Sequence, residues 1–145
     1  MNLIETSLTI ALKAHTGQTD KAGQAYILHP LRIMAKMDTE EEMAVALLHD
    51  VLEDSQFTAQ DLLEADIPTQ VVEAVQLLTK QDGEDYDTFI ERILPNPLAA
   101  KVKKADIEDN LNLLRLQSLT EKDLQRVDKY HYAWHRLNSP RQQGK

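Results

Sequence analysis

Apolar residues recur at helical spacing through most of this chain. Leu8, Ala11 and Leu12 share one face of a helix that the pattern predicts from about Leu3 to Thr16. Further helices are predicted over residues 29–36, 40–54, 58–66, 68–80, 85–94, 98–117 and 120–137. No stretch shows the clear alternation that is typical of a half-buried strand, so the pattern predicts an all-α chain.

Polar residues and glycines mark the ends of these predicted helices. Thr39 is a predicted N-cap with acidic residues in the turn after it, and Thr58 pairs with Asp61 as a capping pair. Gly17 and Gly23 supply backbone freedom to a loop that lies between the first two helices. Together these signals predict a single helical domain over residues 1–138, followed by a flexible tail over residues 139–145.

Composition narrows the class of protein. The 145 residues are 42% hydrophobic and 28% charged, as in an ordinary globular domain, and the absence of cysteine excludes disulfides and thiolate metal sites. A net charge of -8 argues against nucleic acid as a partner, because binding to phosphates needs a basic face. No apolar run approaches the roughly 20 residues that cross a bilayer, and the first residues lack a signal-peptide pattern. A cytoplasmic location without membrane contact is therefore expected.

One segment places ionisable residues inside an otherwise apolar run. His49 and Asp50 follow two leucines, and Glu53 and Asp54 come one helical turn later. On a continuous helix His49 would align with Glu53, and Asp50 with Asp54, because residues four apart share a face. A lone His-Asp pair on an apolar helix is more often a structural pair. The added acidic pair favours a polar site, since buried ionisable groups are costly unless they are paired or bind a metal.

Two residues elsewhere in the chain could complete a metal site around that His-Asp doublet. His29 opens another predicted helix, and Asp106 lies on the long later helix, where it shares a face with Asn110. Two His and two Asp side chains suit Mn²⁺, Fe²⁺, Co²⁺ or Zn²⁺ more than Ca²⁺. Because such an ion lowers the pKa of water, Glu53 could then act as a general acid or base, with Asp54 as its helper.

Three segments of the chain resemble the hydrolase domain of RelA/SpoT-type alarmone enzymes, which are HD-domain metal-dependent phosphohydrolases. They read AHTGQTDKAGQAYILHP, LLHDVLED and VKKADIEDN, and the resemblance runs from about residue 8 to residue 116. It implies an all-helical HD-domain fold that binds Mn²⁺ through His29, His49, Asp50 and Asp106. The implied reaction removes pyrophosphate from the 3′ position of (p)ppGpp and leaves GDP or GTP.

The same resemblance implies roles for residues around the metal. Glu53 and Asp54 match an acidic doublet that serves hydrolysis, and Asn110 matches an asparagine that helps to hold the nucleotide. Tyr26 matches a tyrosine in the family's loop, where its ring could stack on a base or serve packing. Lys21 could contact a phosphate or remain a solvated loop residue.

The chain departs from the family pattern in two of these segments. Asp20 stands where the family usually has Arg, and Ile107 and Asp109 stand where its last motif often has Arg and His. An Asp in the loop removes a planar group that can stack on a base and adds repulsion toward an anion. The expected function is (p)ppGpp hydrolysis. The alternatives are an HD phosphatase for another nucleotide or small phosphorylated metabolite, and a catalytically silent nucleotide-binding domain.

Overall fold

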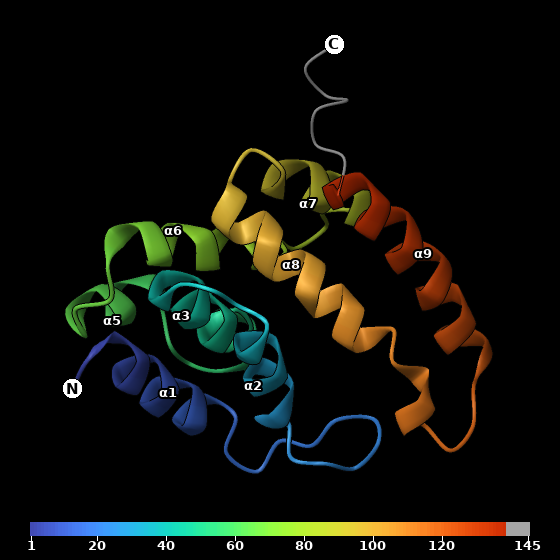
Figure 1. Cartoon of the computed structure of the whole chain (residues 1–145), viewed down its shortest axis with the longest axis horizontal. Helices are drawn as coiled ribbons and strands as arrows, with labels where there is room; N and C mark the ends of the chain where they lie inside the picture. The colour runs from blue at the N-terminus through green and yellow to red at the C-terminus, as the bar shows by residue number, and fades with distance from the viewer. Residues whose placement is uncertain (139–145) are drawn as a thin grey trace.

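The computed structural model describes residues 1–138, and within this range it contains helices and no strand (Figure 1). The α-helices are α1 (Leu3–Ala14), α2 (Leu28–Ala35), α3 (Glu40–Leu48), α4 (Val51–Asp54), α5 (Ala59–Glu64), α6 (Thr69–Leu77), α7 (Tyr86–Ile93), α8 (Pro97–Asn110) and α9 (Glu121–Asn138), and a 3₁₀ turn η1 spans Leu113–Arg115. The all-α prediction is confirmed. The tail predicted over residues 139–145 lies outside the described residues.

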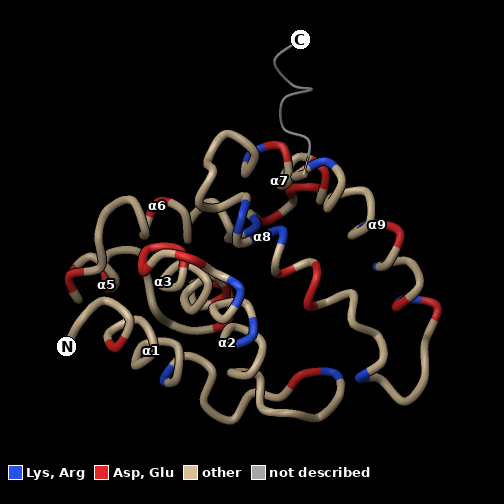
Figure 2. Tube along the Cα trace, in the orientation of Figure 1, with Lys and Arg blue, Asp and Glu red and all other residues tan. Residues whose placement is uncertain are grey.

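The predicted capping residues begin their helices as expected. The Thr39 side chain accepts a hydrogen bond from the backbone N–H of Glu42, whose carboxylate accepts in return from the Thr39 N–H, and Thr58 and Asp61 form the same reciprocal pair at α5. The acidic first turn of α3 also suits the positive end of the helix dipole. Figure 2 shows this acidic segment at the start of α3. The helix starts are therefore fixed by local chemistry.

Helix α3 is the centre of the hydrophobic core. It packs against α1, α2, α6 and α8, and its last five residues, Ala44–Leu48, are fully buried. Burial of a large aliphatic side chain stabilises the folded state by about 1.5–3 kcal/mol. The polar residues that follow Leu48 therefore emerge from the most tightly enclosed part of the molecule. No helix in residues 1–138 is long and apolar enough to cross a membrane.

The predicted helix over residues 40–54 is wrong as a continuous element. Helix α3 ends at Leu48, and α4 begins at Val51. The His49 ring nitrogen Nδ1 lies 2.7 Å from the Ala46 carbonyl oxygen, which is the acceptor that the Asp50 N–H would use in an uninterrupted helix. The imidazole therefore competes with the helical hydrogen bond, and the backbone turns at Asp50, where φ is −106° and ψ is 1°.

The predicted helix over residues 98–117 is also too long. Helix α8 ends at Asn110, and the chain continues into η1. The reason is a side-chain contact: Arg115 donates to the Asp109 backbone carbonyl at 2.8 Å, which draws the following segment back against the end of α8. Along α8, a basic segment precedes an acidic one, as Figure 2 shows. The acidic end faces the site described next.

Candidate metal centre and its two pockets

Four side chains from three parts of the chain meet beside α3. His29 comes from the first turn of α2, His49 and Asp50 from the break between α3 and α4, and Asp106 from α8. Ligand atoms of His29, His49 and Asp50 lie within 4.8 Å of one another. Asp106 Oδ1 lies 2.8 Å from His29 Nε2 and 3.4 Å from His49 Nε2. The structure thus brings together all four residues that the sequence predicted as metal ligands.

Both imidazoles are anchored through Nδ1. His49 Nδ1 lies 2.7 Å from the Ala46 carbonyl oxygen, and His29 Nδ1 lies 2.6 Å from Asp109 Oδ2. These acceptors require a proton on Nδ1, which leaves Nε2 to face the cluster.

The buried Nε2 of His49 has no hydrogen-bond partner within residues 1–138, although Asp50 Oδ2 is 3.0 Å away. A nitrogen lone pair facing carboxylate oxygens is repulsive unless a cation lies between them. The donor set therefore fits a divalent metal ion.

The electrostatics of the cluster also favour a cation at this position. Burial alone would lower the pKa of His49, but the charges of Asp50 and Asp106 raise that pKa well above its usual value. Burial also opposes a charge on His29, whose pKa is nevertheless raised by hydrogen bonds to Asp106 and Asp109. Asp106 is coupled to these rings: burial would raise its pKa, but Lys103 and the two imidazoles lower it. The carboxylates thus favour positive charge at this position, which is the charge that a metal ion would supply.

Asp109 is a functional residue that the sequence analysis did not assign. Its carboxylate is 6% exposed, and besides His29 it accepts from Arg32 Nε and Nη2 at 2.8 and 2.9 Å and from Arg115 Nη1 at 3.3 Å. A carboxylate behind a metal-binding imidazole fixes its tautomer and orientation. The only signal in the sequence was its position three residues after Asp106, on a neighbouring face of the helix.

The side chains of Glu53 and Asp54, both in α4, lie in different surroundings. Glu53 shares a pocket with His49, Asp50 and Asp106, and its Oε1 accepts from the Lys80 N–H at 2.9 Å. Partial burial of its carboxyl group, and then the charges of Asp50 and Asp54, raise its pKa. Asp54 instead borders a separate groove and accepts from Gln18 Nε2 at 3.2 Å. The helical break therefore places only Glu53 in the pocket of the metal cluster.

The pocket that contains Glu53 also carries lysines. It encloses about 450 Å³, and Lys80, Lys103 and Lys129 line it together with the metal-cluster residues. Lys103 Nζ lies 2.9 Å from Asp106 Oδ2. Although burial alone would lower the pKa of Lys103, the neighbouring Asp106 raises it, so the group stays charged. Three ammonium groups next to a metal cluster form a surface that suits phosphate oxygens. We call this cavity the lysine pocket.

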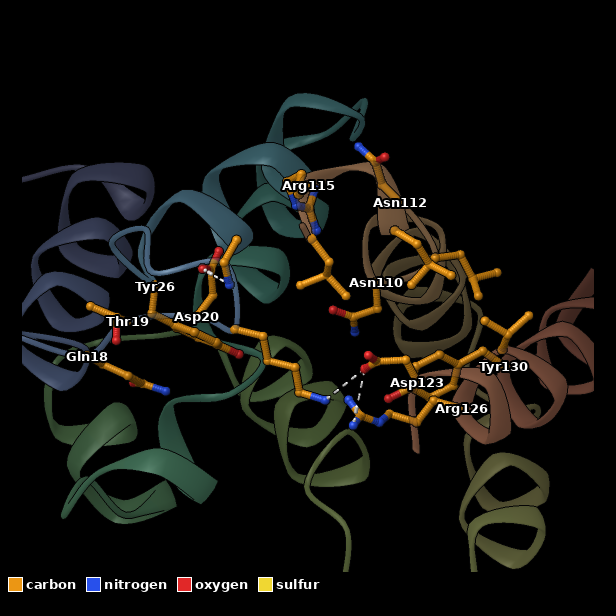
Figure 3. Close-up of a pocket in the computed structure, with 16 residues that line it drawn as sticks. Gln18, Thr19, Asp20, Tyr26, Asn110, Asn112, Arg115, Asp123, Arg126 and Tyr130 are labelled. Atoms are coloured by element: carbon orange, nitrogen blue, oxygen red, sulfur yellow. Dashed lines mark hydrogen bonds and ion pairs between the residues drawn. The ribbon is translucent and has the colours of Figure 1, made fainter. Parts of the chain in front are cut away.

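A second pocket adjoins the cluster and contains all three predicted substrate-binding residues. Lys21, Tyr26 and Asn110 line this cavity of about 290 Å³, and Figure 3 shows Tyr26 on one wall and Asn110 on the other. The Tyr26 hydroxyl donates to Asp50, and Asn110 Nδ2 donates to Asp106 Oδ1 at 3.3 Å. Burial and then Asp50 raise the pKa of the Tyr26 phenol, so it remains a donor. We call this cavity the nucleoside pocket.

Acidic residues also line the nucleoside pocket. Asp20 uses Oδ1 to accept the backbone N–H groups of Ala22 and Gln24, each at 2.9 Å, so its carboxylate closes the turn of its own loop. Lys21 is 57% exposed, and its Nζ lies 3.8 Å from Asp123 Oδ1. Arg126 approaches the same Asp123 oxygen at 3.5 Å, as Figure 3 shows. The cationic groups of this pocket are therefore partly neutralised.

Comparisons with known proteins identify hydrolases to which this chain is similar. No protein-family model matches the chain. The chain is 41% identical over 126 residues to the guanosine-3′,5′-bis(diphosphate) 3′-pyrophosphohydrolase of Vibrio cholerae, an alignment that covers 77% of this chain and 18% of that relative. It is 33% identical over 120 residues to the bifunctional (p)ppGpp synthase/hydrolase SpoT of Escherichia coli, covering 72% of this chain and 17% of the relative. The chain thus spans less than a fifth of the length of these relatives.

A solved structure shows the same fold over nearly the whole chain. This metazoan ortholog of SpoT, described as a protein that hydrolyzes ppGpp, superimposes with a TM-score of 0.68 at 22% sequence identity. The match covers 99% of this chain and 97% of the solved one, which confirms the predicted HD-domain fold. The resemblance is confirmed as well: most of this chain is similar to one segment of the bacterial (p)ppGpp pyrophosphohydrolases.

Proposed function

We propose that this chain is a metal-dependent hydrolase that removes pyrophosphate from the 3′ position of (p)ppGpp. The ligands we assign are His29, His49, Asp50 and Asp106, with Mn²⁺ or another divalent transition metal as the cofactor. The observation that carries the proposal is the pair of Nδ1-anchored imidazoles that face two carboxylates, in a chain similar to (p)ppGpp pyrophosphohydrolases. When bound, the metal supplies Lewis acidity, which neutralises phosphate charge and lowers the pKa of water.

Glu53 is the group that we assign to proton transfer. Burial raises its pKa, which favours exchange of a proton with substrate or water, and it shares a pocket with His49 and Asp50. In the proposed reaction, the oxygen of water bonds to the phosphorus attached at the 3′ position. The bond from that phosphorus to the 3′ oxygen breaks, pyrophosphate leaves, and a proton reaches the 3′ oxygen. Glu53 takes the proton from water or delivers one to the leaving oxygen, and Asp54 assists from outside the pocket.

The two pockets suit the two ends of such a substrate. In the nucleoside pocket, Tyr26 offers an aromatic face, Asn110 a neutral amide and Lys21 an exposed cation. In the lysine pocket, Lys103 and Lys129 add positive charge beside the metal cluster. A nucleotide that carries phosphate groups on both sides of its ribose can therefore extend from one pocket to the other across the cluster.

A second candidate function is supported by the acidic residues of the nucleoside pocket. Asp20 and Asp123 line this cavity, and their charge opposes a nucleotide that carries many phosphates. An HD phosphatase acting on a nucleotide with fewer charges, such as a nucleoside monophosphate, would meet less repulsion there. A comparison of phosphate release from nucleoside monophosphates with pyrophosphate release from ppGpp distinguishes the two functions.

The deciding experiment measures pyrophosphate release from ppGpp by the purified chain with added Mn²⁺. The expected result is metal-dependent release that a chelator abolishes. Asp50→Ala should lose both Mn²⁺ binding and activity, whereas Glu53→Ala should keep Mn²⁺ and lose turnover by at least about 100-fold. Glu73→Ala, on the exposed face of α6, is the control and should match the wild type.

Four outcomes would contradict the proposal. A wild-type chain that binds Mn²⁺ but releases no pyrophosphate excludes alarmone hydrolysis. Activity on nucleoside monophosphates alone would establish the second candidate, and inactivity on every nucleotide would establish a silent binding domain. A Glu53→Ala variant with a near-normal rate would refute the assignment of the proton-transfer residue.

A further inference from the structure

His15 lies at a junction that neither the metal ligands nor the pockets explain. It follows the last residue of α1, and its side chain is fully buried. Gly17 adopts a φ of +78°, and this left-handed turn allows the Gln18 N–H to bond the His15 carbonyl at 3.0 Å. The turn places the two side chains together, with His15 Nδ1 2.8 Å from Gln18 Oε1.

The direction of this contact is fixed by a third residue. Gln18 Nε2 lies 3.2 Å from Asp54 Oδ2, and a carboxylate can only accept a hydrogen bond. The amide of Gln18 must therefore turn its NH₂ group to Asp54 and its oxygen to His15. Because that oxygen is an acceptor, the proton of His15 must be on Nδ1. A chain of hydrogen bonds thus runs from the imidazole through the amide to the carboxylate.

The second ring nitrogen of His15, Nε2, shows that packing alone does not explain an imidazole at this position. Its Nε2 is buried and has no hydrogen-bond partner within residues 1–138. A buried polar atom without a partner is unfavourable, and an aliphatic side chain of similar size would avoid it. The ring also lies 4.8 Å from the Tyr26 ring, and the Tyr26 hydroxyl donates to Asp50. His15 therefore contacts both supports of the catalytic centre, Gln18 and Tyr26.

We infer that His15 and Gln18 form a positioning clamp that holds the Asp54 carboxylate beside Glu53, the residue assigned to proton transfer, in the groove that both residues line. The clamp acts through Asp54 and Tyr26. Gln18 also lines the nucleoside pocket, whereas His15 does not, so His15 reports the positioning role without a substrate contact. This inference deepens the proposed function and rests on it for its kinetic consequence. The structural basis is independent of activity: a fixed Gln18 amide and a His15 ring with its proton on Nδ1.

The kinetic test uses pairs of variants that differ in one hydrogen bond. Gln18→Leu removes the donor to Asp54, and Gln60→Leu makes the same change on exposed α5 as its control. His15→Leu removes the donor to Gln18, whereas His15→Asn retains an N–H close to the position of Nδ1. With ppGpp and saturating Mn²⁺, His15→Leu should lower kcat about tenfold to 100-fold with little change in KM. Gln18→Leu should lower kcat by a similar factor and also raise KM, because Gln18 lines the nucleoside pocket. His15→Asn should recover most of the lost kcat.

The inference is overturned if Gln18→Leu keeps kcat within about twofold, if Gln60→Leu loses as much, or if His15→Asn recovers nothing. Nitrogen-15 NMR of the intact chain gives a second measurement that needs no turnover. The wild type should show His15 with its proton on Nδ1, and Gln18→Leu should show a mixture of tautomers. If the wild type does not hydrolyse ppGpp, the proposed function fails, and this spectrum alone decides whether the clamp exists. A mixed tautomer in the wild type would disprove it.

Discussion

Asp109→Asn tests whether the carboxylate behind His29 supports metal binding, because it leaves the four predicted metal ligands unchanged. Asn has nearly the same shape as Asp, so the change removes a charge without leaving a cavity. In the wild type, Asp109 Oδ2 lies 2.6 Å from His29 Nδ1 and accepts from Arg32 at 2.9 Å. An Asn at this position can instead present its NH₂ group to His29. The ring would then carry its proton on Nε2, which is the nitrogen that faces the metal cluster.

The expected loss follows from that change of tautomer. Substitution of the group behind a metal-binding imidazole costs about 10–100-fold in metal affinity, or roughly 1.4 kcal/mol for each factor of ten. Folding stability should fall as well, because Arg32 and Arg115 lose a buried anionic partner. Their side chains are 32% and 24% exposed and can turn to water, so the loss belongs in the range of about 1–3 kcal/mol.

The assay is calorimetric titration of the metal-free chain with Mn²⁺, together with thermal unfolding. Glu108→Gln is the matched control, because it neutralises the adjacent carboxylate, which is 38% exposed and contacts Lys36 and Trp134 but no predicted ligand. We expect Asp109→Asn to raise the Kd for Mn²⁺ and Glu108→Gln to leave it unchanged. A folded Asp109→Asn variant with a Kd within about twofold of the wild type would refute the orienting role.

Three further predictions concern protons, charge and packing. The metal-free pKa values of His29 and His49 are raised, so their stabilising contribution is complete below about pH 6.5 and is lost as pH rises through the folded-state values. Thermal unfolding should therefore show the metal-free chain losing stability above about pH 6.5. Calorimetry should show Mn²⁺ affinity rising over the same pH range, because the metal needs deprotonated imidazoles. If stability and Mn²⁺ affinity changed in the same direction, the prediction would be contradicted. Lys103→Met removes the ion pair that Lys103 Nζ makes with Asp106 at 2.9 Å. We expect weaker ppGpp binding, measured as a higher KM, and an unchanged KM would show that this ammonium group does not face the substrate. Leu47→Ala, at a fully buried position of α3, should cost about 2–5 kcal/mol in the free energy of unfolding measured with urea, and a loss below about 1 kcal/mol would mean that the core closes around the deletion.

Most of the fold could be predicted because its signals are local. Capping pairs at Thr39 and Thr58 act within one turn, and helical periodicity reports which face is buried. The candidate ligands could be predicted for a similar reason. Burying His49 beside Asp50 in an apolar run is unfavourable unless a partner is present, and this conflict is visible in the sequence itself.

The errors arose where side-chain hydrogen bonds that form only in the folded chain override helical propensity. The break after Leu48 depends on the His49 ring taking the Ala46 carbonyl, and the early end of α8 depends on Arg115 reaching back to Asp109. Neither contact has a local sequence signature. The role of Asp109 was missed for the same reason: its partner His29 is 80 residues away, and only the folded chain brings them together.

The departures from the family pattern are linked through charge. Asp109 binds Arg115, and Asp123 approaches Lys21 and Arg126, so the cations of the nucleoside pocket already face carboxylates. Asp20 keeps its carboxylate in the turn of its own loop. In the lysine pocket Lys103 is also paired, with Asp106, but Lys80 and Lys129 make no ion pair within residues 1–138. Because paired charges attract an anion weakly, phosphate recognition in the proposed reaction falls to the lysine pocket. Selection of the base then depends on stacking and hydrogen bonds, so a change of base should raise KM less than Lys129→Met, which removes a cation of the lysine pocket.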